Sequence, residues 1–425
     1  MADIHNRAAR TEQDWEKLEN HPKLSERNLN QIKKFVDQLK AEDASKDRIH
    51  NYLWSFNVLA SSIDFQLDNA SKQDLVRLVG KINSNELEAP KRTEKDGELQ
   101  IEMEDKEYGA YSRAEFRKTL SKMYRAFYSE RDKIRFISTD PKKKNLSKLK
   151  AEELPKPKHI KELVRNAKNS RDEALIMALW DTGGRIEAVL NLKWKNFNPG
   201  ENSYIRFTER NKTMLRKIPV AESVPSLKKW SDEHPNPDPE EYIFTKYEGN
   251  KATKHAGLEP VKYSTIYSML KRVRKETDLP EKVKTNPHAF RKARATFLAA
   301  SGMNVNMLAK FMGWSDIKTA EKYVSLAQDQ LTSSFKEAVG LEEDTESQGL
   351  EMDKEELKPG RCRSCNAVVS AAWSHCHNCG DTIQGDNLLS LLEERNGRDV
   401  LEKADQEELE EALQKLQSLK NEGLI

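Results

Sequence analysis

Four cysteines stand in a C-x2-C-x10-C-x2-C pattern, which is the spacing of metal ligands. They are the only cysteines among 425 residues and fall within 18 positions: Cys362, Cys365, Cys376 and Cys379. A disulfide framework would more often be spread through a small secreted domain. Each C-x-x-C pair instead presents two thiolates to a tetrahedral zinc ion, and four sulfurs leave no open position for water. The pattern predicts one structural zinc ion, with a redox dithiol pair as the alternative.

The ten residues between the two cysteine pairs, Asn366–His375, are long enough for a short hairpin. This spacing resembles that of small zinc ribbons. His375 and His377 lie close by, but four cysteines already complete the ligand set. The module has a modest charge within an acidic stretch, so the sequence leaves open whether it contacts DNA or protein.

Three separated segments carry the other residues whose types suit catalysis. They are TGGRIEAVLNLKW at 182–194, HAFR at 288–291, and MGW at 312–314 with Tyr323 nine residues after the tryptophan. Each segment has an ordinary structural explanation when taken alone. A T-G-x-R turn can end a helix, His288 can cap a helix, and lone aromatic residues usually belong to a core.

In this order, the segments resemble the tyrosine recombinase (phage integrase) family. That family has T-G-x-R, then H-x-x-R, then G followed by His or Trp, and a tyrosine nine residues later. All four elements match in type and order, and the resemblance covers about residues 155–335. It implies an enzyme that cuts and rejoins DNA strands through a 3′-phosphotyrosine intermediate.

The resemblance also implies a role for each matched residue. Tyr323 is the nucleophile, which leaves a free 5′-hydroxyl on the DNA. Arg185 and Arg291 stabilise the charge on the non-bridging phosphate oxygens, for which a planar guanidinium is well suited. His288 is the general base or a hydrogen-bond donor. Trp314 can only donate through its indole N–H, so it holds the phosphate and packs the nucleophile's helix.

A lysine on a turn between two strands supplies the acid in this family, and Lys212 in ERNKT at 209–213 is the matching residue. Arg210, Arg216 and Lys217 lie nearby as other cations. We expect no catalytic metal, because side chains provide the charge. Two positions depart from the family pattern: Ala188 and Lys292 stand where an acidic residue and a histidine are usual, although Glu187 precedes the first of them.

Composition and charge narrow the class of protein. Charged residues make up 33% of the chain and apolar residues 36%, and no run approaches the ~18 apolar residues of a membrane span. The N-terminus has no apolar segment typical of a secretory signal. The net charge of +2 combines +13 over residues 1–340 with −11 over residues 341–425. A basic body with an acidic tail suggests polyanion binding, with a well-solvated surface as the alternative.

Hydrophobic periodicity and capping residues predict the elements that position these groups. In the first part we expect a helix after Ser25, a helix at 47–63, a helix that begins at Ser71, and a helix after a capping box of Ser112 and Glu115. Residues 83–106 read as a loop or a short hairpin. In the second part we expect strands at 204–207 and 217–220, and helices at 160–167, 171–181, 264–277, 289–301, 305–312, 317–324, 328–339 and about 399–420.

These elements predict a mainly α fold with a small β-sheet. The expected order is a helical core-binding domain, a mixed α/β catalytic domain, a zinc ribbon and a C-terminal helix. The boundaries are 1–138 for the helical domain, 139–158 for a basic linker, 159–340 for the catalytic domain, 341–360 for an acidic link, 361–383 for the ribbon and 384–425 for the tail.

The resulting hypothesis is a site-specific DNA recombinase. We expect its partners to be double-stranded DNA and further copies of itself, assembled as a tetramer in the synapse, with no membrane contact. We expect a cytoplasmic protein, associated with the nucleoid in a prokaryote. The alternatives are a type IB topoisomerase-like relaxing enzyme and a non-cleaving DNA-binding protein on the same fold.

Overall fold

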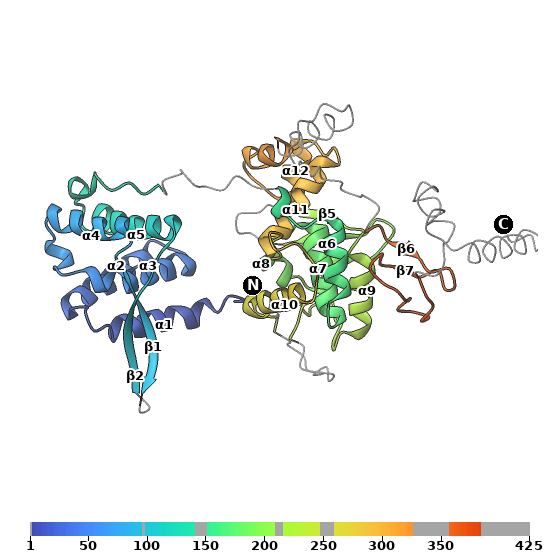
Figure 1. Cartoon of the computed structure of the whole chain (residues 1–425), viewed down its shortest axis with the longest axis horizontal. Helices are drawn as coiled ribbons and strands as arrows, with labels where there is room; N and C mark the ends of the chain where they lie inside the picture. The colour runs from blue at the N-terminus through green and yellow to red at the C-terminus, as the bar shows by residue number, and fades with distance from the viewer. Residues whose placement is uncertain are drawn as a thin grey trace, which may run out of the picture. The chain divides into compact units, whose positions relative to one another are not determined.

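The computed structural model describes residues 2–95, 98–140, 151–208, 216–246, 259–325 and 357–383, and helices dominate these parts (Figure 1). The chain divides into two units, which are described one at a time. Unit 1 comprises Met1–Glu153, Tyr242–Gly249 and Ala256–Met269, and unit 2 comprises Leu154–Glu241, Asn250–His255 and Leu270–Ile425.

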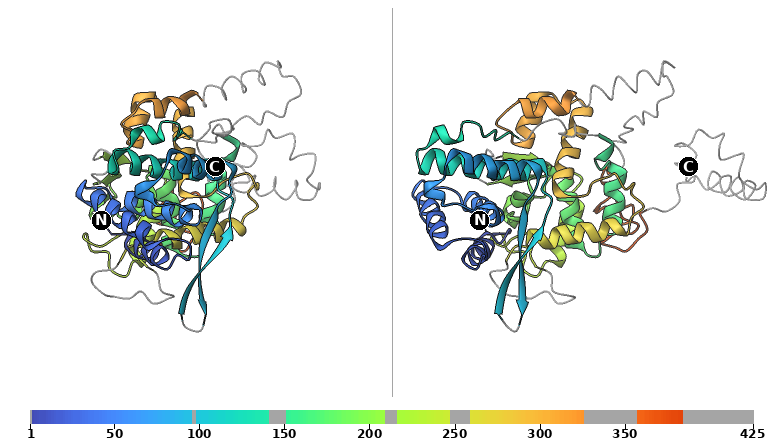
Figure 2. Two further views of the ribbon diagram at one scale, coloured as in Figure 1. Left: turned by 90° about the vertical axis from the view of Figure 1, so that its left-hand side faces the viewer. Right: turned by 60° about the vertical axis from the view of Figure 1, so that its left-hand side comes forward.

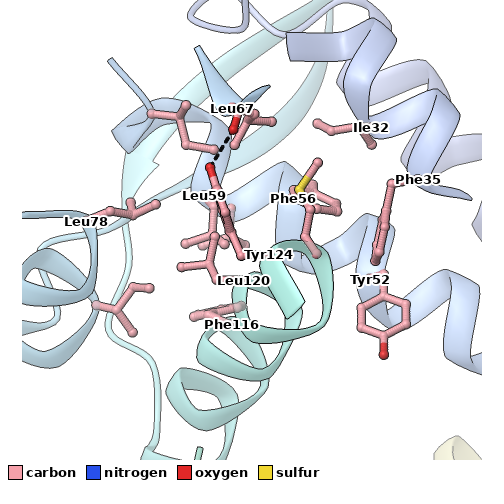
Figure 3. Close-up of a cluster of buried hydrophobic side chains, with 14 of the residues drawn as sticks. Ile32, Phe35, Tyr52, Phe56, Leu59, Leu67, Leu78, Phe116, Leu120 and Tyr124 are labelled. Carbon is pink, nitrogen blue, oxygen red and sulfur yellow. Dashed lines mark hydrogen bonds between the residues drawn. The ribbon is translucent and has the colours of Figure 1, made fainter. Parts of the chain in front are cut away.

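The helices of unit 1 surround one apolar core (Figure 3). In α2 the buried residues Ile32, Phe35 and Leu39 recur at helical spacing, so one face of the helix packs inward. The buried Tyr124 satisfies its hydroxyl by donating to the Leu67 carbonyl oxygen at 2.7 Å. The helices are α1 (Arg7–Glu19), α2 (Glu26–Ala41), α3 (Lys46–Leu59), α4 (Lys72–Ser84) and α5 (Ala110–Lys122).

Helix starts in unit 1 agree with the sequence predictions except at α5. Ser25 caps α2, and Ser71 forms a capping box with Asp74 at α4. The capping box predicted at Ser112 is wrong, because α5 begins at Ala110 with Gly109 at the N-cap, so Ser112 lies inside the helix.

The segment between α4 and α5 is a long β-hairpin. Strands β1 (Glu88–Lys95) and β2 (Glu98–Asp105) pair antiparallel, from Glu88 opposite Asp105 to Lys95 opposite Glu98. The hairpin extends away from the helices in every view (Figure 1, Figure 2). Of the two expected alternatives, the hairpin is confirmed, and eight residues per strand make it longer than expected.

Unit 2 is organised around α7 (Ser170–Thr182), in which all 13 residues are buried. Helices α6, α9 and α11 pack against it. A three-stranded antiparallel sheet has the order β3–β4–β5. The remaining elements of unit 2 are α6 (Pro157–Arg165), α8 (Ile186–Leu190), β3 (Phe197–Asn198), β4 (Tyr204–Phe207), β5 (Arg216–Pro219), α9 (Val224–Glu233), α11 (Pro287–Ala300), α12 (Val305–Met312), β6 (Gly360–Arg361) and β7 (Val368–Val369). The division between the units falls within α10 (Tyr263–Lys275), after Met269.

The mainly α fold class with small sheets is confirmed over the described residues. The second predicted strand begins one residue earlier than expected, and residues 318–325 are helical close to the predicted position. The predicted helices at 328–339 and about 399–420 lie outside the described residues. Among the helices that are described, none has the length and apolar character needed to cross a bilayer.

Candidate active site

The turn after α7 requires two consecutive glycines. Gly183 has a φ of +53°, and a Cβ at this position would lie 3.0 Å from the Cε of Met312. A Cβ on Gly184 would lie 2.6 Å from Cγ2 of Val189. A positive φ and a close approach both favour glycine. The turn leaves Arg185 exposed at the N-cap of α8, immediately beyond the buried helix.

Arg291 joins this turn to the end of α12. Asn286 caps α11, and Arg291 follows one turn into that helix with only 5% of its surface exposed. One guanidinium nitrogen donates to the Gly183 carbonyl oxygen at 2.6 Å, and another donates to the Met312 carbonyl oxygen at 2.6 Å. The guanidinium therefore ties the first and third sequence segments together through their backbones.

The third segment brings Tyr323 to the same place. Gly313 ends α12 with a φ of +65°, and the chain returns as the helix at 318–325. The rings of Trp314 and Tyr323 stack with centroids 5.1 Å apart and planes 10° apart. Arg291 lies over the Trp314 ring, 5.4 Å from its centroid. Tyr323 is buried, and its phenol feels the positive charge of Arg291.

Burial and like charges shift the pKa values of this cluster. Burial, followed by the charges of Arg185 and Arg216, lowers the pKa of Arg291 to about 9. Burial raises the pKa of Tyr323, and the nearby charge of Arg291 opposes that rise. At neutral pH, therefore, Arg291 remains a cation and Tyr323 keeps its proton.

His288 behaves differently from its cationic neighbours. It lies on the exposed side of the first turn of α11. Partial desolvation of its ring, followed by the charges of Lys292, Arg291 and Arg185, lowers its pKa. A neutral imidazole is a proton acceptor. The cluster therefore offers fixed positive charge for an anion, a phenol, and a neutral base among the same neighbours.

A sequence match agrees with this geometry. Residues 154–330 match the model of the phage integrase family. This segment is therefore similar to the phage integrase domain. Among curated proteins it is similar to a tyrosine recombinase XerA of Saccharolobus solfataricus, with 28% identity over 192 residues that span 42% of this chain and 54% of that protein. It is also similar to transposase A from transposon Tn554 of Staphylococcus aureus, with 24% identity across 46% of this chain and 53% of the transposase.

The chain therefore spans about half the length of those two relatives. A solved structure of the XerH site-specific recombinase bound to a palindromic difH substrate shares 15% identity. That comparison covers 78% of this chain and 95% of XerH, with a TM-score of 0.49.

Three further positions named from the sequence remain to be placed relative to the cluster of Arg291, Trp314 and Tyr323. Lys212 lies outside the described residues. Ala188, which stands where the family usually has an acidic residue, is buried at 7% exposure beside the α7 turn. Lys292 is half-buried, and its charge contributes to the lowered pKa of His288.

A buried charge network lies one helical turn from Arg291 on α11. Arg294, one turn beyond Arg291 on α11, donates to Asp181 at 3.0 Å and to Glu222 at 2.7 Å. The second oxygen of Asp181 accepts from the Ser223 backbone N–H and hydroxyl, each at 2.9 Å. Burial outweighs the attraction of Arg294 and raises the pKa of Glu222 to about 7. This network joins α7, α11 and the turn between β5 and α9.

The sequence pattern did not single out this network. Asp181 directly precedes the T-G-x-R segment, and Arg294 stands three residues after Arg291, so both lie next to recognised residues. Their pairing joins positions 113 residues apart, which periodicity and spacing cannot detect. Glu222 carries no motif at all.

The four cysteines converge as their spacing predicts. One ligand atom from each lies within 4.8 Å of every other. The Sγ atoms of Cys362 and Cys379 are 3.5 Å apart, and those of Cys365 and Cys376 are 3.6 Å apart. A tetrahedral zinc ion with Zn–S bonds of about 2.3 Å places its sulfurs roughly 3.8 Å apart. The spacing fits such an ion, and it is far longer than an S–S bond of about 2.05 Å.

Proposed function

We propose that this protein is a site-specific DNA recombinase that cuts and rejoins DNA strands through a 3′-phosphotyrosine intermediate. The environment of Tyr323 carries the proposal. Its buried ring stacks on Trp314, and the buried Arg291 beside that pair is fixed by the backbones of two separate turns. Such a site is suited to holding a phosphodiester against a tyrosine hydroxyl.

The bond changes balance without a co-reactant. The Tyr323 oxygen attacks the phosphorus, a phosphotyrosine ester forms, and the bond from phosphorus to the 5′-oxygen breaks. His288, whose lowered pKa keeps it neutral, accepts the tyrosine proton. Lys212 gives a proton to the leaving 5′-oxygen. Attack by a 5′-hydroxyl on the phosphotyrosine reverses these steps and rejoins a strand.

Positive charge from side chains stabilises the transition state. Arg185 is exposed at the N-cap of α8, and Arg291 remains charged at neutral pH. Preorganised guanidinium groups of this kind stabilise negative charge as it develops on the phosphate oxygens. Trp314 donates its indole N–H to the phosphate and supports the tyrosine ring. In this proposal the reaction needs no catalytic metal.

The proposal extends to the partners and to the cysteine module. The substrate is double-stranded DNA, and two sites are exchanged within a tetramer of this chain. Zinc, when bound by the four cysteines, has a structural role, because four sulfurs fill its coordination shell. The protein acts in the cytoplasm, at the nucleoid if the cell is prokaryotic. The domains follow the sequence boundaries of 1–138, 159–340 and 361–383, with linkers between them.

Replacing Tyr323 with phenylalanine tests the proposal. Tyr323→Phe keeps the ring stacked on Trp314 and removes only the attacking hydroxyl. We expect no covalent protein–DNA adduct on nicked genomic fragments, with DNA affinity within a few-fold of the wild type. Tyr267→Phe, at a tyrosine that is 51% exposed on α10, is the matched control and should form the adduct normally. An adduct formed by Tyr323→Phe would exclude the tyrosine as the nucleophile.

The same adducts distinguish recombination from its alternatives. Sequencing the DNA ends attached to Tyr323 identifies the cleavage site, which can then be placed once or twice on a plasmid. A recombinase exchanges strands only when two sites are present, whereas a relaxing enzyme removes supercoils with one. A protein that binds without cleaving would give no attached ends.

A further inference from the structure

The cysteine module presents a buried face to the integrase domain. Trp373, three residues before Cys376, is only 7% exposed, and Ser370 and Ala372 beside it are 2% and 3% exposed. Figure 1 shows β6 and β7 beside α9, and β7 contacts that helix. These residues all belong to unit 2. The module is therefore packed on a surface of its own chain.

Two polar contacts fix the position of this face. The Trp373 indole N–H donates to the Glu173 carboxylate in the first turn of α7. The Nε of Arg165, the last residue of α6, donates to the Ala372 carbonyl oxygen at 3.3 Å. A buried indole N–H and a buried carboxylate both require partners, so each satisfies the other.

The receiving surface is preorganised by other residues of the integrase domain. Glu173 is 6% exposed and also accepts from the Ser226 hydroxyl at 2.8 Å and from the Lys229 ammonium at 3.0 Å, both on α9. The Lys229 nitrogen lies 5.1 Å from the centroid of the Trp373 ring, within the range of a cation–π contact. The tryptophan thus fills a socket formed by α6, α7 and α9.

The module cannot hold this tryptophan in place by apolar packing alone. Its buried cluster consists of Cys362, Val369, Trp373 and Cys376, so two of the four members are metal ligands. A module of this size cannot build a self-sufficient core, and bound metal commonly supplies the missing folding free energy. The shape of the surface that carries Trp373 therefore depends on the cysteine site.

We propose that the metal-loaded cysteine module is a brace for the integrase domain, with Trp373 as the contact that transmits metal binding to α7. Metal binding orders the module, the module seats Trp373 against Glu173, and the first turn of α7 is held to α6 and α9. The T-G-x-R turn lies at the other end of α7, roughly 15 Å from Glu173 at about 1.5 Å per residue. By linkage, a folded integrase domain must in turn strengthen metal binding.

The test uses the full chain with Zn²⁺ as the probe. Cys376→Ser removes a ligand, Trp373→Ala removes the seated ring, and Arg363→Ala alters an exposed residue of the same module as the matched control. The readouts are zinc content per chain, zinc affinity, thermal unfolding, and amide hydrogen exchange in α6, α7 and α9. None of these readouts depends on DNA cleavage, so they test the structural role of the module separately from the proposed recombinase activity.

We expect one zinc ion per chain in the wild type and in Arg363→Ala, with unchanged exchange in the three helices. Cys376→Ser should lose the zinc, lower the melting temperature by about 5 °C, and speed exchange at the start of α7 and along α9. Trp373→Ala should produce the same exchange pattern and bind zinc at least roughly tenfold more weakly, as linkage requires. Combining Cys376→Ser with Trp373→Ala should change the melting temperature and the exchange rates little beyond Cys376→Ser alone, because both changes undo the same contact.

Trp373→Phe keeps the proposal testable if the alanine variant fails to fold. It retains the ring and removes the indole N–H donor to Glu173, so it should shift exchange and zinc affinity in the same direction by a smaller amount. Wild-type exchange in α6, α7 and α9 after zinc loss would overturn the brace. Additive effects in the double variant, or a wild-type chain that binds no zinc, would overturn it as well.

Discussion

At the scale of single residues, Arg291 determines the geometry of the site. Two of the five N–H donors of its guanidinium are used by the Gly183 and Met312 carbonyl oxygens, each at 2.6 Å. Its plane is therefore fixed by the fold, and within the part of the chain that the structure describes no other hydrogen bond occupies the remaining donors. A lysine would keep the charge but could not span both carbonyls in one plane.

The pKa shifts of His288 and Arg291 predict a bell-shaped pH profile for adduct formation by Tyr323. His288 must be neutral to accept a proton, and its pKa is lowered, so the rate should rise with pH through a midpoint below His288's ordinary pKa of about 6.5. Arg291 must remain charged, and its pKa is lowered to about 9, so the rate should fall above that pH. The measurement is the single-turnover rate on a nicked duplex across both limbs.

Two outcomes test whether His288 causes the acidic limb of the pH profile and Arg291 the alkaline limb. His288→Gln should slow adduct formation and remove the acidic limb while the alkaline limb persists. An acidic limb that survives in His288→Gln would show that another group accepts the proton. A rate that stays constant well above pH 9 would show that Arg291 keeps its proton there, or that its charge is not needed.

Motif spacing pointed to residues that do lie together, because each motif is local in sequence. Arg291, Trp314 and Tyr323 do meet, and Arg185 and His288 are electrostatic neighbours of Arg291. What spacing could not predict is how Arg291 is held. Its partners are backbone carbonyl oxygens, and a carbonyl has no side-chain identity for a sequence pattern to detect.

At the scale of secondary-structure elements, one salt-bridge network ties α7, α11 and the β5–α9 turn together. Asp181 and Arg294 are 1% and 7% exposed, and Arg294 bridges Asp181 to Glu222. Because Arg291 lies one turn from Arg294 on α11, the network also fixes the helix register that presents Arg291 to the α7 turn. In the proposed reaction it would position Arg291, since none of its members contacts Tyr323 in the described contacts.

Removing the charge of Arg294 should destabilise unit 2 strongly. Arg294→Met keeps much of the side-chain volume but leaves Asp181 and Glu222 as buried carboxyl groups without their cation. Breaking one partner from a buried network of this kind costs about 3–5 kcal/mol. We expect a loss of that size in the free energy of unfolding at pH 7, measured by denaturant titration, while Lys310→Met at an exposed position of α12 should change little.

The pH dependence of Arg294→Met adds a check that simple loss of packing would not pass. Without its cation, the buried Glu222 binds its proton more tightly when folded than when unfolded, so the variant should recover stability relative to the wild type as the pH falls. Burial already raises the pKa of Glu222 to about 7 with Arg294 present, so part of this recovery should appear just below that pH. A loss of stability that is independent of pH would point to packing alone.

Elements were predicted best where local capping decides them. Ser71 forms the expected capping box with Asp74, whereas the similar pattern at Ser112 does not begin a helix. Near α5, tertiary contacts dominate: the buried Tyr108 donates its backbone N–H to the Asn85 side chain at 2.8 Å, which anchors the chain before Gly109. The helix can then begin three residues ahead of the local capping pattern, with Gly109 in place of Ser112 at the N-cap.

At the scale of the whole molecule, charge is divided unevenly along the chain. Residues 1–383 carry a net charge of +8, and residues 384–425 carry −6. The sequence alone predicts this division, since it depends only on composition. The packing of the cysteine module was not predictable in this way, because Trp373 and Glu173 are 200 residues apart and no local pattern pairs them.

The charge division predicts that the acidic tail weakens binding to DNA. Positive charge on a protein attracts the phosphate backbone without regard to sequence, and a tethered acidic segment competes for the same positive surface. A chain truncated after residue 383 keeps the cysteine module and gains net positive charge. We expect it to bind a short duplex of arbitrary sequence about fivefold more tightly than the full chain at low salt, measured by fluorescence anisotropy. The advantage should shrink as salt rises, because screening weakens both attractions.

A full-length variant with four tail carboxylates replaced, Glu407→Gln, Glu408→Gln, Glu410→Gln and Glu411→Gln, separates charge from length and should show part of the same gain. Equal affinity of the truncated and full chains at low salt would mean that the tail does not compete with DNA, and a gain seen only on truncation would assign the effect to its bulk.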